Sequence, residues 1–180
     1  MNKRLRKILC ILVLSGLSFG AFAGGLDNKN GIGTYVFMSD RPFGGLQYER
    51  RVGDSNSVGL KFGLFAYYDN DSTTEPLNMS FTMEVDYSLF ETTYKDKICS
   101  RLFLYALAGY QGGIDRKWDY VNEVPKEETF YNNALTSLGV GFDFIFMDHL
   151  SVPLQLGMVG IFPYQTKIGF TACIGVRYVW

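Results

Sequence analysis

Apolar and polar residues alternate along most of this chain. The clearest stretch is 77–89, where thirteen residues alternate strictly: apolar side chains occupy the odd positions and polar side chains occupy the even ones. Alternation of this kind indicates a β-strand with one apolar and one polar face. The stretch is longer than the usual strand of about 5–6 residues. It is long enough for a tilted strand to cross a bilayer, which takes about 9–11 residues.

The same alternation predicts seven further strands. They are expected at residues 31–38, 45–52, 58–68, 101–110, 137–146, 150–158 and about 166–180. The connections on one side are mostly short, at 53–57, 90–97 and 147–149. Those on the other side include the longest, at 39–44, 69–76, 111–133 and 159–165. This layout is typical of an outer-membrane barrel. The predicted fold class is all-β: an eight-stranded antiparallel up-and-down transmembrane β-barrel.

Alternation alone does not say which face of each strand points inward. A secreted lipocalin-like binder also has eight strands, but its large apolar residues point inward. Three features favour the membrane barrel: long apolar faces, many glycines on the opposite face, and an aromatic residue, Trp180, at the end of the last strand. The lipocalin-like barrel remains the alternative fold.

The first 23 residues have the three parts of a secretory signal peptide. Four basic residues precede an apolar run at 8–19, and Ala21-Phe22-Ala23 supplies the small residues of a cleavage site. We therefore divide the chain into a cleaved signal, 1–23, and an outer-membrane β-barrel domain, 24–180. Cleavage removes four of the 17 Lys and Arg residues and none of the 18 acidic residues, which changes the formal charge from −1 to −5. An acidic mature chain argues against a nucleic-acid partner.

The C-terminal residues carry a family resemblance. The chain ends Gly175-Val176-Arg177-Tyr178-Val179-Trp180, which is similar to the signal that the barrel-insertion machinery reads, with Gly175, Tyr178 and Trp180 at its key positions. Ile174 departs from the polar residue usual before the glycine. The segment 148–151 looks like a tight periplasmic turn of the same family. The chain thus resembles the small eight-stranded bacterial outer-membrane barrels of the OmpA/OmpX type. The resemblance implies a monomer in the bacterial outer membrane whose partners are membrane lipids and the insertion machinery.

If the apolar faces meet lipid, the other faces line the lumen. Eight charged residues, four acidic and four basic, then gather in its periplasmic and middle part: Glu49, Arg51, Lys61, Glu84, Asp86, Arg101, Asp143 and Arg177. Four aromatic residues gather toward the outside: Phe65, Tyr67, Phe103 and Tyr105. Side chains just fill an eight-stranded barrel, and buried charges must pair. We expect a lumen plugged by a self-neutralising network. The alternative is a narrow porin-like pore or a barrel that binds or transports a small apolar ligand.

The long predicted loop, 111–133, is the best candidate for an interaction surface. Trp118 and Tyr120 lie among charged residues in it, and such rings often anchor protein interfaces. They could instead sit at the lipid–water boundary, where aromatic residues are common. The resemblance implies that loops on this side meet host factors, phage or neighbouring cells. We therefore expect an extracellular partner.

The sequence offers little for catalysis. His149, the single histidine, precedes Ser151 with the His-x-Ser spacing of lipid A deacylases, but no acidic residue follows Asp148 to orient the ring. We predict a structural turn histidine and no enzyme, with lipid A modification as the least favoured alternative. His149, Cys99 and Cys173 are too scattered for a metal site, and no cofactor is expected.

Two smaller features complete the predictions. Cys99 and Cys173 fall on inward faces at different depths, whereas a disulfide needs Cα atoms within about 7 Å, so we expect two free buried thiols. Pro153 interrupts a predicted strand of a closed sheet and removes one hydrogen bond from it. A β-bulge near the periplasmic rim would accommodate it.

Overall fold

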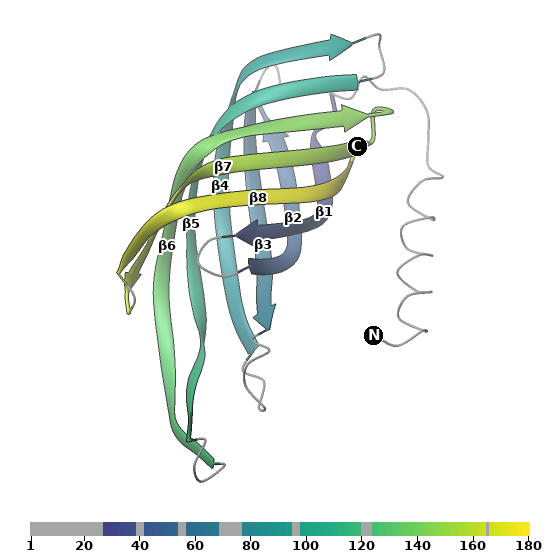
Figure 1. Ribbon diagram of the computed structural model, residues 1–180. Helices are drawn as coiled ribbons and strands as arrows, with labels where there is room; N and C mark the ends of the chain where they lie inside the picture. The colour runs from purple at the N-terminus through teal and green to yellow at the C-terminus, as the bar shows by residue number, and fades with distance from the viewer. Residues whose placement is uncertain are drawn as a thin grey trace, which may run out of the picture.

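The computed structural model describes residues 27–38, 42–53, 57–68, 77–94, 98–119, 124–164 and 166–180. Eight antiparallel strands, each bonded to its neighbours in chain order, close into one barrel when β8 pairs with β1 (Figure 1). The strands are β1 (Asn30–Met38), β2 (Pro42–Val52), β3 (Val58–Tyr68), β4 (Leu77–Tyr94), β5 (Ile98–Asp119), β6 (Val124–Phe146), β7 (Leu150–Pro163) and β8 (Lys167–Val179). The predicted eight-stranded all-β barrel is confirmed. The predicted signal peptide lies outside the described residues. Within them, no helix has the length and apolarity needed to cross a bilayer.

We call the end where β2, β4, β6 and β8 finish the turn rim, and the opposite end the far rim. At the turn rim, the start of β1 and Trp180 close the seam between β1 and β8. Asn30 N donates to Trp180 O and Trp180 N donates to Asn30 O, both at 2.9 Å. The first and last strands are thus joined by their backbones out to the final residue.

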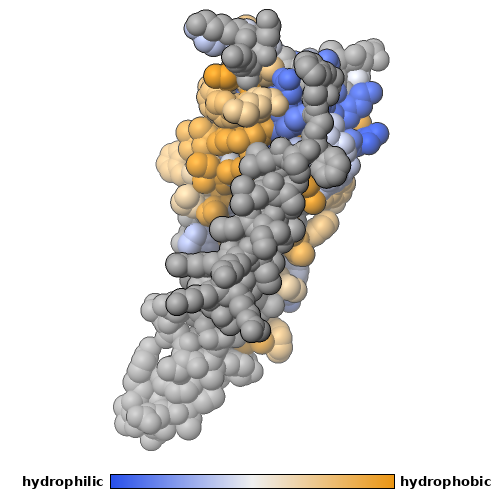
Figure 2. Space-filling model, turned by 90° about the vertical axis from the view of Figure 1, so that its right-hand side faces the viewer, coloured by the Kyte–Doolittle hydropathy of each residue, from blue (hydrophilic) through white to orange (hydrophobic). Residues whose placement is uncertain are grey.

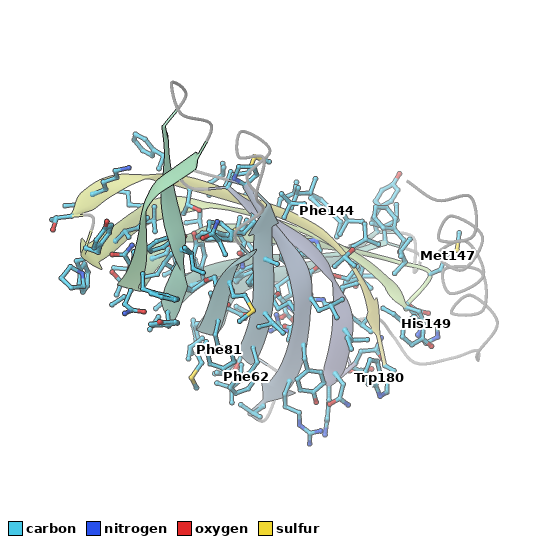
Figure 3. The ribbon with its side chains drawn as sticks, turned by 90° about the horizontal axis from the view of Figure 1, so that it is seen from below. Phe62, Phe81, Phe144, Met147, His149 and Trp180 are labelled. Carbon is cyan, nitrogen blue, oxygen red and sulfur yellow. The ribbon has the colours of Figure 1, made fainter. Side chains whose placement is uncertain are left out.

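The side chains settle which face of each strand is inside. Large apolar residues such as Leu64 and Phe170 are 59% and 85% exposed on the outer wall, where Figure 2 shows a hydrophobic band. Phe62 and Phe81 also project from this outer side (Figure 3). All eight charged residues predicted for the lumen are buried. The lipocalin-like alternative is therefore wrong for this chain, because it requires the apolar faces to point inward.

β4 extends beyond its predicted end. The segment 90–97 was expected to be a turn, but residues 90–94 continue the strand. A β-bulge between Ser88 and Phe90 shifts the register of β4 against β5. The extra residue leaves Leu89 and Phe90 both exposed. An inserted residue breaks the period-two pattern, which is why the alternation appeared to stop there.

The predicted loop 111–133 is mostly strand. β5 and β6 remain paired from Gln111↔Asn133 to Asp119↔Val124. Within the described residues, pairing of β4 with β5 stops at Gly112, and pairing of β7 with β6 stops at Asn133. Residues 113–119 and 124–132 therefore form a two-stranded extension, the free ribbon, which projects past the rest of the far rim (Figure 1). Apolar and polar residues do not alternate over most of this stretch, so the pattern did not mark it as strand.

Two other predicted loops are also shorter than expected. β2 begins at Pro42, within the predicted loop 39–44, and β7 runs to Pro163, within the predicted loop 159–165. Each segment contains a glycine and a proline, and these residues indicate turns in a sequence.

Pro153 does not create the predicted β-bulge. The pairing of β7 with β8 is interrupted at residues 152–153 and resumes in the same register, from Ser151↔Arg177 to Leu154↔Ile174. On its other side, β7 stays paired with β6 at this position, through Asp143↔Pro153. Proline lacks a backbone N–H, so the ladder loses a bond locally without an inserted residue.

Candidate functional site: the barrel interior

The strand registers bring the interior charges together. On neighbouring strands, Lys61 of β3 is directly opposite both Glu49 of β2 and Glu84 of β4. On the other side of the barrel, Arg101 of β5 is opposite Asp143 of β6. Residues directly opposite on a sheet face have Cβ atoms about 4.5–5.5 Å apart. The strand register by itself therefore places acidic residues beside basic ones, whatever rotamers their side chains adopt.

Seven of the eight predicted charges form one continuous network. Lys61 Nζ lies 2.6 Å from Glu84 Oε1 and 2.9 Å from Asp86 Oδ2. Arg51 continues the chain, with Nη2 3.2 Å from Asp86 Oδ1 and Nε 2.9 Å from Glu49 Oε1.

Arg177 completes this network from β8. Its guanidinium pairs with Glu49 and, at 2.5 Å, with Asp143 Oδ2. The network thereby joins β2, β3, β4, β6 and β8 across the interior. Leaving a buried charge without its partner costs several kcal/mol, so these pairs keep a charged interior compatible with a stable barrel.

Arg101 has a partner that the sequence did not indicate. Its Nε donates to Glu91 Oε1 of β4 at 2.7 Å. Glu91 has an odd number, and the alternation of 77–89 puts odd positions of β4 on the apolar side. The β-bulge after Ser88 reverses this phase and turns Glu91 inward, so only the bulge could have revealed it.

Neutral side chains complete the polar interior and were also missed. Gln155 Nε2 donates to Glu84 Oε1 at 2.6 Å, and Ser151 Oγ donates to Asp143 Oδ1 at 2.5 Å. The signal available for both residues was their position on the inward face of strands that the sequence already predicts. These bonds occupy carboxylate lone pairs that the bases leave open.

Aromatic and aliphatic side chains fill the interior toward the far rim. Phe65, Phe103 and Tyr105 are buried in one cluster there. The cluster also includes Tyr35, Phe37, Phe43, Leu107, Leu135, Val159, Ile161 and Cys173. The backbone of Tyr67 lies in β3, but its side chain is outside the described part.

Lys61 marks the boundary between the two interior zones. Its ammonium is 4.4 Å from the centroid of the Phe103 ring, a cation–π geometry. Gly141 also faces this ring, and a Cβ there would overlap Phe103. The glycine therefore makes the room that the ring fills.

Known structures resemble this barrel. The N-terminal β-barrel domain of Pseudomonas aeruginosa OprF aligns with a TM-score of 0.62 at 16% identity, covering 85% of this chain and 98% of that one. The chain has the fold of the small outer-membrane β-barrels. Neisserial surface protein A aligns with a TM-score of 0.47 at 8% identity, covering 84% of this chain and 95% of that one. Ail, the attachment invasion locus protein of Yersinia pestis, gives 0.43 at 12% identity, covering 85% and 97%.

No family model matches the sequence. No curated protein matches it either.

The predicted insertion-signal residues lie at the end of β8. The ring of Tyr178 stacks against His149 and against Trp180, with ring centroids 5.5 and 5.9 Å away. His149 and Trp180 lie near each other at this rim (Figure 3). Gly175 is buried against the ring of Tyr35, where a Cβ would not fit. Recognition of these residues by insertion machinery stays a prediction.

The β6–β7 turn differs slightly from the predicted segment 148–151. Met147 and Asp148 have φ of 51° and 62°, and His149 N donates to Phe146 O at 3.2 Å. Two central residues with positive φ define a type I′ hairpin turn. Leu150 and Ser151 already belong to β7.

His149 and Ser151 do not face a common reaction site. His149 Nδ1 is 3.0 Å from Val179 O at the rim, while Ser151 Oγ is buried and bonded to Asp143 and Arg177. Cys99 and Cys173 are free and buried, as predicted. No group of three His, Cys, Asp or Glu residues in the described part could hold a metal.

Of the two residues proposed for the exposed loop, Trp118 lies in β5, opposite Pro125. Its side chain is outside the described part, and Tyr120 is outside it entirely. Their part in binding is therefore still a prediction.

Proposed function

We propose that this chain is an exported outer-membrane β-barrel of a bacterium with two membranes, with a structural or surface-interaction role and no catalysis. One observation carries the proposal: a closed barrel with its apolar side chains outside and its charges inside. On β8, outward apolar residues run from Ile168 to Trp180. Twelve steps of about 3.3 Å, tilted by about 40°, span about 30 Å, which matches the hydrocarbon core of a bilayer.

The lengths of the connections suggest the orientation. Barrels of this class have short periplasmic turns and longer extracellular loops. The tight β6–β7 turn, the start of β1 and Trp180 lie at the turn rim, while the free ribbon extends from the far rim. We therefore assign the turn rim to the periplasm and the far rim to the cell exterior.

We further propose that the lumen is closed. The ionic network and the aromatic cluster together occupy the interior from the turn rim toward the far rim. The experiment is single-channel recording on the folded mature chain in planar bilayers. We expect no steady conductance. Reproducible conductance steps that change in Glu84→Gln or Arg101→Gln would overturn the closed lumen in favour of a narrow pore.

The free ribbon is our candidate for an extracellular binding surface. It continues two barrel strands past the far rim, so its base is fixed, while neither of its edges pairs with a further strand among the described residues. Deletion of the ribbon should abolish any adhesion to host cells that expression of the chain confers on a non-adherent bacterium. Unchanged adhesion by the deleted form would place the binding surface elsewhere.

The absence of catalysis is proposed from the arrangement around His149. The Nδ1 atom of its ring contacts a backbone carbonyl, and the hydroxyl of Ser151 donates a hydrogen bond to the interior network. His149→Ala should leave the acylation of lipid A unchanged in cells that express the chain. A change in acyl-chain number that depends on His149 would restore the enzyme alternative.

A further inference from the structure

A small pocket lies inside the barrel at the turn rim. It has a volume of about 10 Å³, which suits one water-sized particle. Its lining includes Lys29, Glu49, Arg51, Arg101, Asp143 and Arg177. Four of these side chains are cationic and two are anionic, so the pocket presents more positive than negative charge.

The carboxylates of the pocket are fully engaged. Glu49 pairs through Oε1 with Arg51 and through Oε2 with Arg177. Asp143 accepts from Ser151 at Oδ1 and from Arg177 at Oδ2. Neither acid has an oxygen left over to attract a cation into the pocket.

Most of the buried side-chain atoms at the pocket that lack a hydrogen-bond partner are N–H donors. The acceptor among them, Glu49 Oε1, is ion-paired with Arg51 Nε at 2.9 Å. Arg101, 2% exposed, donates through Nε to Glu91, but its buried Nη2 has no hydrogen-bond partner. Arg177, equally buried, has no partner at Nε. An unmade hydrogen bond from a buried donor costs about 1–3 kcal/mol, and more when the group is charged. Two guanidinium groups, from β5 and β8, therefore each leave a donor without a partner at one small pocket.

We propose that this pocket binds a small monovalent anion, with chloride as the occupant. A chloride ion accepts several N–H bonds and donates none, which matches the groups left unpaired. A water molecule would bring two hydrogens, and the carboxylate oxygen at the pocket without a hydrogen bond, Glu49 Oε1, is already ion-paired with Arg51. Phosphate and sulfate are too large for the volume. The occupant would enter from the turn rim, and the aromatic cluster on the far-rim side of Lys61 would stop it from crossing the barrel.

The test measures unfolding of the detergent-folded chain in chloride and in gluconate at equal ionic strength. Gluconate keeps the ionic screening but is too large to enter. At a chloride concentration about nine times the dissociation constant, the folded-to-unfolded ratio should be about tenfold higher than in gluconate. Arg101→Gln should abolish this difference. An equal response to both salts in the wild-type chain would overturn the proposal.

Arg50→Gln is the matched control. Arg50 precedes Arg51 in β2 but faces outward, where Nη1 donates to Asn30 Oδ1 at 2.9 Å. It has the same charge at the same rim without lining the pocket, so its variant should keep the chloride effect. Loss of the effect in Arg50→Gln would show that rim charge, and not the pocket, is responsible.

A second measurement covers the case in which Arg101→Gln fails to fold. Wild-type crystals grown in bromide should show an anomalous peak in the pocket between Arg101 and Arg177. An ordered water without anomalous signal, or no density, would overturn the site. Neither measurement depends on conductance or adhesion, so failure here is separable from failure of the proposed function.

Discussion

At the scale of single residues, the interior depends on complementary charges. Lys61 is the clearest case, because its buried ammonium serves two carboxylates and one aromatic ring. Its removal therefore tests how strongly the ionic interior supports the barrel.

Lys61→Met should destabilise the folded barrel strongly. The substitution leaves Glu84 and Asp86 buried with one compensating cation fewer, and breaking a buried pair costs about 3–5 kcal/mol. Urea unfolding of the chain in lipid vesicles measures the change. Arg50→Met, on the exposed outer side, is the control and should stay within about 0.5 kcal/mol. Equal effects of the two substitutions would contradict a paired interior.

A second residue-scale prediction concerns the space beneath Phe103. Gly141→Ala places a methyl group against that ring, and overpacking of this kind costs about 1–3 kcal/mol. Gly169→Ala is the control on the same kind of strand, because a Cβ there meets nothing within 4 Å. Thermal unfolding should separate the two variants. If Gly169→Ala were the more damaging, the ring would not be what excludes a side chain at Gly141.

At the scale of elements, β5 and β6 have two different parts. Their parts nearer the turn rim belong to the closed barrel, and their parts beyond the far rim pair only with each other in the described structure. An isolated two-stranded hairpin is marginally stable in water. The free ribbon is therefore supported by the barrel, while the barrel gains few contacts from it.

Replacement of residues 114–130 by Asn-Gly should leave the barrel intact. This dipeptide suits a two-residue hairpin turn. The new turn would join Gly113 to Tyr131, which are already paired, and would keep the 2.7 Å bond from Tyr131 to Asn78. The shortened chain should fold in detergent with an unchanged unfolding temperature. Failure to fold would mean that the ribbon is part of the stabilising core.

At the scale of the whole molecule, the closed wall should be visible in simple assays. The mature chain in detergent should give a β-rich circular dichroism spectrum and a faster band when unboiled than when boiled. Its apolar exterior should also make folding depend on detergent or lipid. A chain that folds as a monomer in plain buffer would contradict a membrane location.

The closed wall should also protect both cysteines. Cys99 and Cys173 are buried behind it, so a thiol reagent should label neither in the folded chain and both after boiling. Boiling without reductant provides the control, since a disulfide would block labelling there. Rapid labelling of the folded form would show that the interior admits small solutes.

The sequence by itself determined the strand type, the strand number and, along most strands, which residues share a face. These follow from the period of two along a strand, which is a local property. The place of Glu84, Asp86 or Arg177 in the alternation sets the face of the strand on which its side chain lies. The alternation also put Phe103 and Tyr105 on the same face as Arg101 without any knowledge of their partners.

Only the tertiary structure decided which face is inside and which charges meet. Closure of the sheet brings Arg177 of β8 against Glu49 of β2. These two residues lie far apart in the sequence, so no local pattern encodes their contact. The β-bulge that turns Glu91 toward Arg101 depends on pairing with a neighbouring strand. The free ribbon arises likewise from where β4 and β7 stop pairing. Local alternation fixes the two faces of a strand, whereas closure and register fix what each face touches.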